Sequence, residues 1–299
     1  MNGTSLRVLT PAKVNLILRV LERRSDGFHD IWSLMQTVGL EDELRLTVTP
    51  DRPVRIDLRC DHAQLASDQS NLVYRAAQLV LERAGQSAEV SITLTKRIPL
   101  GAGLGGGSSD AAATILGLAK LLGLSWSGEQ MAAIGQRLGS DVPFFFVAPT
   151  ACVTGRGEHV RPVRLLGRRW ITLVNPGFPV ETKWAYQQLV STRAAVRPLS
   201  GAHRHLDVQS EMDWSEVTQA AENDFETPVF ARHPVLADIK RRLLDAGAEV
   251  ALLSGSGATM FGVFREQTVA ERAAALFVEE GQMKAVAVPT AGAPVLSPA

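Results

Sequence analysis

Pro99-Leu-Gly-Ala-Gly-Leu-Gly-Gly-Gly-Ser-Ser-Asp-Ala-Ala-Ala113 lies between a stretch of alternating polarity and a stretch rich in Ala and Leu. The alternation over Val90–Thr95 predicts a strand, and the apolar spacing over Asp110–Leu122 predicts a helix. Glycine lacks a Cβ, so a glycine-rich turn lets backbone N–H groups approach a ligand closely. A helix N-terminus adds unpaired N–H donors and the positive end of the helix dipole. The stretch therefore predicts a cradle for nucleotide phosphate, with Ser108 and Ser109 as helix caps.

Three known glycine-rich loops are alternatives for this stretch. A P-loop measured from Gly101 would need lysine where Gly107 stands, so its cationic phosphate ligand is missing. Gly101, Gly103 and Gly106 formally match the dinucleotide fingerprint, but the acid-ended strand expected about 20 residues later is absent. The V-A-I-K and H-R-D motifs that accompany the protein-kinase glycine loop are also absent. A flexible linker is disfavoured because linkers seldom lie directly between a strand and an Ala-rich helix.

Length and composition favour a cytoplasmic globular protein. The 299 residues fit two domains of ordinary size. Lys plus Arg and Asp plus Glu each total 31, which argues against nucleic acid as the main partner. Cys60 and Cys152 are expected to be reduced thiols. We expect no signal peptide, because Met1–Leu16 has no long apolar run and is interrupted by Lys13. We expect no membrane span, because the sequence has no apolar run of about 18 residues.

Two pairs of side chains near the N-terminus are candidates for ligand contact. Lys13 and Asn15 lie two residues apart in a predicted strand, so they point to the same side. This pattern alone leaves open whether Lys13 is functional or a solvated lysine of an edge strand. Phe28 and His29 follow a turn predicted at Gly27, where a ring and an imidazole suit a flat heterocycle. A lone histidine in a loop is more often simply solvated.

An acidic residue further along lies in an apolar setting. Asp141 stands two residues before Pro143 and the phenylalanines of Phe144–Phe146. An acid just before a proline is common at helix starts, so helix capping is the alternative to a functional role. An acid at the rim of an apolar wall is partly desolvated, and desolvation raises its basicity, so Asp141 is a candidate functional residue.

The second half of the chain alternates predicted strands and helices. Over Thr182–Val190 we expect a helix that places Thr182 and Tyr186 one turn apart on one face. Ser191–Glu216 is polar and weakly patterned, and we expect it to be mobile. A second small-residue loop, Ser254-Gly-Ser-Gly-Ala-Thr259, follows a predicted strand. The tail from Pro289 onward is rich in Pro, Ala and Gly and is expected to fray.

Three separated motifs resemble those of the GHMP kinases, the superfamily of galactokinase, homoserine kinase, mevalonate kinase and phosphomevalonate kinase. They are Pro11-Ala-Lys-Val-Asn-Leu16, Pro99–Ser109 and Leu253-Ser-Gly-Ser-Gly-Ala258, which occur in the right order and span nearly the whole chain. The resemblance implies an α+β, two-domain GHMP kinase fold. An N-terminal ATP-binding domain like ribosomal protein S5 domain 2 is expected over residues 1–165, and a ferredoxin-like C-terminal domain over residues 166–299.

Within the superfamily, Ala12–Leu16, Asp26–His29 and Gly139–Phe144 resemble the kinases whose substrate carries cytidine diphosphate. The resemblance implies ATP-dependent phosphorylation of the 2-hydroxyl of 4-diphosphocytidyl-2-C-methyl-D-erythritol (CDP-methylerythritol), in the non-mevalonate (MEP) pathway to isoprenoids and terpenoids. ATP and Mg²⁺ are the implied cofactors; we expect no nucleic acid or membrane partner, and a monomer or weak homodimer. Two alternatives stay open: another small-molecule kinase of homoserine or mevalonate type, and a catalytically silent ligand-binding relative.

The resemblance also implies roles for single residues. Asp141 would take the proton from the substrate hydroxyl, and Lys13 would lie close to it and to the transferring phosphoryl group. Phe28 stands where the family usually has Tyr, so the ring is kept and one hydroxyl is lost. The implied substrate-binding residues are Asn15, Phe28, His29, Thr182 and Tyr186.

The glycine loop would hold the ATP phosphates through backbone N–H groups of Gly103–Ser109. Lys96 and Asn71 lie near the elements expected to contact adenine, but the sequence does not assign those contacts, and no acidic residue is clearly placed for Mg²⁺. The implied ATP-binding residues are Pro99, Leu100, Gly101, Ala102, Gly103, Leu104, Gly105, Gly106, Gly107, Ser108 and Ser109.

Overall fold

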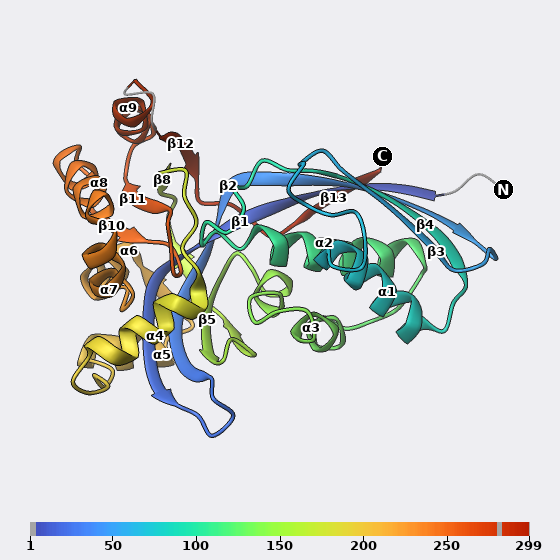
Figure 1. Cartoon of the computed structure of the whole chain (residues 1–299), viewed down its shortest axis with the longest axis horizontal. Helices are drawn as coiled ribbons and strands as arrows, with labels where there is room; N and C mark the ends of the chain where they lie inside the picture. The colour runs from blue at the N-terminus through green and yellow to red at the C-terminus, as the bar shows by residue number, and fades with distance from the viewer. Residues whose placement is uncertain (1–3, 280–282, 299) are drawn as a thin grey trace.

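The computed structural model describes residues 4–279 and 283–298, and Figure 1 shows two groups of strands and helices. The first group contains a seven-stranded sheet. Its strands are β1 (Thr4–Arg23), β2 (His29–Pro50), β3 (Arg55–Cys60), β4 (Ala88–Thr95), β5 (Thr150–Gly155), β6 (His159–Pro162) and β13 (Val295–Pro298). The order is β13-β1-β2-β4-β3, and β5 and then β6 branch from β2. Only the β3–β4 pair is parallel among these described strands.

Helices cover one face of this sheet (Figure 1). They are α1 (Leu72–Ala84), α2 (Gly106–Leu121), α3 (Gly128–Gln136) and the 3₁₀ helix η1 (Pro143–Phe146). Helix α2 packs closest where it carries Gly117, because a Cβ there would lie 2.2 Å from Cδ1 of Leu46 in β2. Ile115 and Leu118 of α2 are fully buried on the same sheet. The Ala-rich sequence of α2 therefore permits the close helix–sheet contact that fixes the helix start.

The second group contains a four-stranded antiparallel sheet in the order β10-β11-β8-β12. Helix α9 packs on it, and the hydroxyl of Thr172 in β8 donates a hydrogen bond to the Ala270 carbonyl of α9 (2.8 Å). The strands are β8 (Trp170–Asn175), β10 (Val250–Leu253), β11 (Met260–Phe264) and β12 (Lys284–Pro289), with a short parallel pair β7 (Arg164–Leu166) and β9 (Glu211–Asp213). The helices are α4 (Thr182–Thr192), α5 (Gly201–Val208), α6 (Trp214–Ala220), α7 (Glu226–Arg232), α8 (Pro234–Asp245) and α9 (Gln267–Val278).

The β1–β2 hairpin belongs to both groups. Its strands are 20 and 22 residues long, and Figure 1 shows them running from the first sheet down beside α4 and α5. Leu16, Ile17 and Leu18 in consecutive positions of β1 are all buried, so this part of the strand has packing on both faces. The boundary predicted at residues 165 and 166 falls within β7, and the division into 1–165 and 166–299 stays a prediction.

Side chains cap helices α1 and α3, whereas α2 begins without a side-chain cap. Asn71 caps α1 by accepting a hydrogen bond from the Val73 amide (2.9 Å), and Ser127 forms a capping box at α3. Helix α2 begins at Gly106, earlier than predicted, with Gly105 as its N-cap and no side-chain cap. The prediction that Ser108 and Ser109 are caps is therefore wrong.

Two further expectations are wrong. The region 191–216 contains α5, β9 and the start of α6, and its Leu206, Met212 and Trp214 are buried. Their spacing fits no single period, because three short elements follow one another there. Part of the tail forms β13, which pairs antiparallel with β1 at Leu6–Leu9. Within residues 4–279 and 283–298, no helix is long and apolar enough to cross a membrane.

Candidate active site

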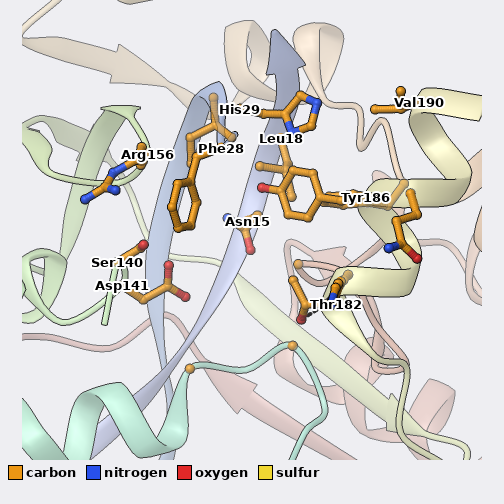
Figure 2. A pocket seen from close by; sticks show the side chains of 18 of the residues that line it. Asn15, Leu18, Phe28, His29, Ser140, Asp141, Arg156, Thr182, Tyr186 and Val190 are labelled. Atoms are coloured by element: carbon orange, nitrogen blue, oxygen red, sulfur yellow. Dashed lines mark hydrogen bonds between the residues drawn. The ribbon is translucent and has the colours of Figure 1, made fainter. Parts of the chain in front are cut away.

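A cavity of about 900 Å³ opens where the two groups of elements meet. Figure 2 shows side chains from the β1–β2 hairpin, from α4 and from the segment before η1 around it. Its lining is Lys13, Asn15, Leu18, Arg23, Gly27, Phe28, His29, Ile31, Met35, Gly103, Gly105, Ser140, Asp141, Arg156, Thr182, Lys183, Tyr186, Gln187, Val190, Ser191, Phe225, Gly255 and Ser256. All seven residues that the sequence predicts as catalytic or substrate-binding line this one cavity.

Lys13 lies at the bottom of the cavity, where three loops meet. Its side chain is 4% exposed, so it is not the solvated edge lysine that the strand pattern left open. Its ammonium donates hydrogen bonds to Oδ1 of Asn15 (2.8 Å) and to the Gly103 carbonyl (3.1 Å). The Asn15 contact confirms that the two side chains share one side of the strand. The ammonium of Lys13 is therefore held against the glycine loop.

Asp141 faces Lys13 across the cavity floor. Its Oδ2 lies 3.4 Å from the Lys13 ammonium, and its side chain is 31% exposed. The 3₁₀ helix that follows has Val142 as its N-cap and no side-chain cap, so Asp141 does not cap it. A carboxylate that is ion-paired on one side and open to the cavity on the other can accept a proton from a bound hydroxyl.

The glycine loop has the backbone that its sequence predicts. Gly101, Gly103 and Gly105 have φ of 59°, 78° and 71°, a region that L side chains rarely adopt. A Cβ on Gly103 would lie 2.0 Å from the Ser254 carbonyl oxygen, so glycine is required there. The first turn of α2 has no acidic residue and no side-chain cap, so its amides are available to an anion.

Other loop residues serve packing. Ala102 and Leu104 are buried in the core, so only their backbone atoms are available to a ligand. Ser109 is also fully buried, and its hydroxyl donates to the Pro11 carbonyl (2.7 Å) and contacts the Thr10 hydroxyl. Among Pro99–Ser109, Gly103 and Gly105 contribute to the cavity lining.

The second small-residue loop contacts the glycine loop and the start of α4. Ser254 donates its hydroxyl proton to the Gly103 carbonyl (2.9 Å). Ser256 and Thr182 form a hydroxyl–hydroxyl hydrogen bond (2.9 Å), which ties the loop to the start of α4. The three sequence motifs, far apart in the chain, therefore converge on the Gly103 carbonyl.

Aromatic side chains form the opposite end of the cavity. Figure 2 shows Phe28 and Tyr186 on its two sides, with His29 beside Tyr186. The rings of His29 and Tyr186 stack with centroids 5.3 Å apart and planes at 19°. Tyr186 also meets Phe225 edge-on at 4.8 Å. Phe28 is 55% exposed, so its ring is available to a flat ligand.

Burial sets the protonation of two of these groups. Burial lowers the pKa of His29, and the nearby charges of Arg193 and Arg23 lower it further. Its Nε2 atom is buried and has no hydrogen-bond partner among the described residues. Burial, followed by the charge of Asp141, raises the pKa of Tyr186 to about 12. The cavity therefore presents a neutral imidazole and a protonated phenol at neutral pH.

The lining of this end also includes Arg156, for which the sequence gives no signal. The guanidinium carbon of Arg156 lies 4.7 Å from the centroid of the Phe28 ring, on the side away from Tyr186 (Figure 2). Arg156 comes from the turn between β5 and β6, and its local sequence does not indicate what that turn contacts. Asp26 lies 3.8 Å from the same guanidinium.

Neither residue considered for adenine lines this cavity. Lys96 is buried between two carboxylates: it contacts Asp42 and lies 2.7 Å from Oδ2 of Asp110. Burial alone would lower the pKa of Lys96, but the charges of Asp110 and Asp42 raise it overall. Asn71 is used as the cap of α1. The adenine contacts stay unassigned.

The described side chains do not form a complete binding site for a metal ion. In the described part of the chain, no three His, Cys, Asp or Glu side chains gather in a way that could hold one. Asp141 is the one acidic residue in the cavity lining. Mg²⁺ commonly binds through one or two carboxylates together with substrate phosphates and water. These residues therefore fit an ion that arrives with a nucleotide.

Two family models match the chain: the GHMP kinase N-terminal domain over residues 71–148 and the GHMP kinase C-terminal domain over residues 202–280. A curated protein of Syntrophotalea carbinolica named 4-diphosphocytidyl-2-C-methyl-D-erythritol kinase is 41% identical, over 94% of this chain and 97% of its own length. A relative of the same name from Solibacter usitatus is 42% identical, over 90% of this chain and 84% of its own.

Solved structures show the same similarity. A crystal structure of a 4-(cytidine 5'-diphospho)-2C-methyl-D-erythritol kinase has a TM-score of 0.75 and 35% identity, covering 95% of this chain and 98% of that one. A homoserine kinase from Cytophaga hutchinsonii has a TM-score of 0.76 at 21% identity, covering 98% and 97%. At that identity, the second likeness shows the fold alone.

Proposed function

This chain belongs to the GHMP kinases, within the family of 4-diphosphocytidyl-2-C-methyl-D-erythritol kinases, and we propose that it phosphorylates CDP-methylerythritol with ATP. The two-domain α+β fold expected from the motifs is confirmed by the family models and the solved relatives. The acceptor is the 2-hydroxyl, and the product enters the MEP pathway to isoprenoid precursors.

The observation that carries the proposal is the 3.4 Å approach of Lys13 to Asp141 beside the glycine loop. Asp141 accepts the proton of the 2-hydroxyl as the alkoxide oxygen attacks the γ-phosphorus of ATP. The bond between that phosphorus and the β,γ-bridging oxygen breaks, and ADP leaves. Phosphoryl transfer needs positioning and charge neutralisation more than covalent help, which suits a site of this composition.

Lys13 lies close to two negatively charged groups, the transferring phosphoryl group and the carboxylate of Asp141. Its ammonium is held by Asn15 and the Gly103 carbonyl, so it is fixed in direction before a ligand binds. A preorganised cation stabilises the negative charge that develops on the transferring group. The same cation lies 3.4 Å from Asp141, so the base and the transferring group share one positive charge.

The ATP phosphates are held by the amides of the glycine loop and the first turn of α2. The free helix start, with its positive dipole end, supports this assignment. Mg²⁺ arriving with the nucleotide would supply further neutralisation of charge, and Asp141, an acidic side chain of the cavity lining, would help to hold it.

The cytidine end is bound between Phe28 and Tyr186. Two aromatic rings on opposite sides of a cavity suit the stacking of a flat base, and the imidazole of His29 lines the cavity beside Tyr186. Thr182, fixed by Ser256, stands between this end and the loop. A cytoplasmic location and a monomer or weak homodimer stay predictions.

A substrate panel tests the proposal. The purified chain is incubated with ATP, Mg²⁺ and, separately, CDP-methylerythritol, homoserine and mevalonate. We expect ADP formation in equal amount to a new phosphomonoester, read by phosphorus NMR, with strong preference for the cytidine substrate. Faster turnover of homoserine or mevalonate would assign the chain to another GHMP kinase activity. No ATP turnover with any alcohol would favour a silent ligand-binding relative.

A further inference from the structure

Asn223 lies outside the motifs described above, and it contacts the small-residue loop directly. Its amide nitrogen donates two hydrogen bonds, to the carbonyls of Leu253 (2.7 Å) and Gly255 (2.8 Å). The Leu253 carbonyl belongs to the peptide that precedes Ser254, and the Gly255 carbonyl belongs to the peptide between Gly255 and Ser256, so one side chain holds the backbone on both sides of that serine. Asn223 is 5% exposed, so water does not compete for these bonds.

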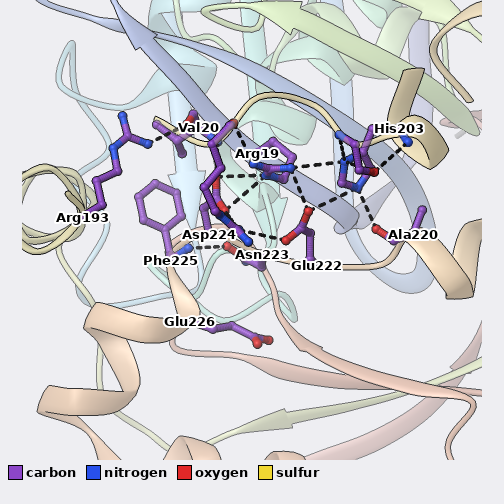
Figure 3. A network of polar contacts seen from close by, with 12 residues as sticks. Arg19, Val20, Arg193, His203, Ala220, Glu222, Asn223, Asp224, Phe225 and Glu226 are labelled. Carbon is purple, nitrogen blue, oxygen red and sulfur yellow. Dashed lines mark hydrogen bonds and ion pairs between the residues drawn. The ribbon is translucent and has the colours of Figure 1, made fainter. Parts of the chain in front are cut away.

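The backbone of Asn223 is fixed to the β1–β2 hairpin (Figure 3). Asn223 pairs with Leu18 of β1. The Leu18 amide donates a hydrogen bond to the Glu222 carbonyl (2.8 Å), and the Asp224 amide donates one to the Leu18 carbonyl (3.0 Å). The segment therefore forms a single parallel β-bridge with β1. It connects the hairpin to the loop between β10 and β11.

A buried arginine holds this segment in place. Arg19 of β1 is 2% exposed and lies 3.2 Å from Asp224 and 2.8 Å from Glu222, the residues on either side of Asn223. Its guanidinium also contacts Nδ1 of His203 (3.2 Å). A buried guanidinium with several charge-assisted partners allows little freedom to the residues that it pairs with. The ion pairs of Glu222 and Asp224 with Arg19 thus fix the residues before and after Asn223, and with them the direction of its side chain.

The contact chain ends at the catalytic cation. Ser254, between the two carbonyls that Asn223 fixes, donates to the Gly103 carbonyl (2.9 Å), and Lys13 donates to the same oxygen (3.1 Å). A shift of Ser254 would change the position of that carbonyl and, through it, of the Lys13 ammonium. A misplacement of about 1 Å can cost about 10²-fold in rate.

We infer that Asn223 is a positioning residue, which fixes Ser254 and through it the Gly103 carbonyl and Lys13. The effect on turnover rests on the proposed kinase function, whereas the effect on the loop does not. Asn223 also accepts a hydrogen bond at Oδ1 from the Phe225 amide (2.9 Å), on the side of the aromatic end. The two functions of its amide group can therefore be separated by substitution.

Asn223→Asp keeps the acceptor for Phe225 and removes the donors to Leu253 and Gly255. We expect kcat to fall about 10–100-fold, while the KM of CDP-methylerythritol stays within about threefold. Asn223→Ala loses both contacts and is expected to raise that KM as well. If Asn223 acts through Ser254, the double variant Asn223→Asp/Ser254→Ala should turn over no more slowly than Asn223→Asp alone.

The matched control is Thr172→Val. It also removes one buried hydrogen bond to a backbone carbonyl, but it lies on the α9 side of the second sheet, away from the cavity lining. It should lower thermal stability and leave kcat unchanged. Equal losses of kcat in Thr172→Val and Asn223→Asp, or a fully additive double variant, would overturn the inference.

A measurement without substrate tests the loop itself. The Gly257 amide donates to the Ser254 carbonyl (2.9 Å), so its hydrogen exchange reports whether the loop keeps its conformation. We expect at least about tenfold faster exchange in Asn223→Asp and no change in Thr172→Val. Unchanged exchange in Asn223→Asp would disprove the positioning role whatever substrate the enzyme uses, and failure of the wild type on CDP-methylerythritol would disprove only the proposed function.

Discussion

The Lys13 ammonium and the Asp141 carboxylate lie 3.4 Å apart, and they reach this distance from two different elements. Lys13 is buried in β1, whereas Asp141 lies in the turn between α3 and η1 and remains open to the cavity. One group is therefore held rigidly while the other can meet a substrate. This division suits a fixed cation and a base that exchanges protons with a bound hydroxyl.

The first prediction concerns this pair. Asp141→Asn keeps the shape of the side chain and removes the base, so turnover should fall by about 10²–10⁴-fold. Lys13→Ala removes the fixed cation and should cost about 10²–10³-fold. Both variants should still bind ATP, measured by calorimetry with a non-hydrolysable analogue. Full activity in either variant would contradict the assigned roles.

The second prediction compares two glycines of similar backbone conformation. Gly103 and Gly123 have φ of 78° and 66°, so alanine at either position costs about 1–2 kcal/mol in backbone energy. A Cβ on Gly103 would also lie 2.0 Å from the Ser254 carbonyl oxygen, whereas one on Gly123 would meet nothing within 4 Å. Gly103→Ala should therefore lose activity, and Gly123→Ala should only lower the melting temperature. Similar kcat values in the two variants would contradict a close approach of the loops.

The third prediction concerns the substitution of the family's usual Tyr by Phe28. The Arg156 guanidinium stacks on the outer face of this ring and holds it beside the cavity. An exposed cation–π contact contributes about 0.5–1 kcal/mol, so Arg156→Leu should raise the KM of CDP-methylerythritol about two- to fivefold. Phe28→Leu removes the stacking surface itself and should raise KM more, by the factor that corresponds to a loss of about 1–3 kcal/mol in binding free energy. Phe28→Tyr is the control that keeps the ring. If its KM rises as much as that of Phe28→Leu, stacking is not the main contribution of Phe28 to substrate binding.

The fourth prediction concerns the pH dependence of substrate binding. Burial lowers the pKa of His29, so the imidazole is neutral at neutral pH. It gains its proton only at a pH below the ordinary pKa of histidine. The KM of CDP-methylerythritol should therefore be constant between about pH 7 and pH 8, and should rise as the solution is acidified. His29→Gln, which does not titrate, should remove that rise. An unchanged acid-side rise in His29→Gln would assign the titration to another group.

Local patterns and long-range pairing differ in how well the sequence predicts them. The phosphate cradle is predicted because strand, glycines and helix are consecutive in sequence, and the shared side of Lys13 and Asn15 follows from the period of a strand. The Arg156–Phe28 stack and the two bonds of Asn223 have no such signal, because they join elements far apart in the chain. The sequence predicts the start of α2 too late, because Gly105 in the left-handed region serves as its cap and the caps expected from Ser108 and Ser109 are not needed. The pairing of the tail as β13 depends on β1 offering a free edge, which only the assembled sheet supplies.

The last prediction concerns stability beneath the glycine loop. Lys96 is shared by two buried carboxylates, Asp42 and Asp110, so one negative charge is in excess, and Oδ1 of Asp110 has no hydrogen-bond partner among the described residues. Burial, opposed by the Lys96 charge and aided by that of Asp42, raises the pKa of Asp110 to about 7. The unfolded chain titrates this carboxyl near its ordinary pKa of about 3.9.

Between about pH 4 and pH 7 the folded protein therefore binds the proton more tightly than the unfolded chain does. The stability contributed by protonated Asp110 is complete below about pH 4 and is lost as the pH rises through about 7. Asp110→Asn removes this titration and leaves Lys96 paired with Asp42 alone. The free energy of unfolding of the wild type, relative to Asp110→Asn, should fall as the pH rises from about 5 to 8 in urea denaturation. Parallel pH profiles of the two proteins would mean that Asp110 keeps an ordinary pKa and that Lys96 balances both carboxylates.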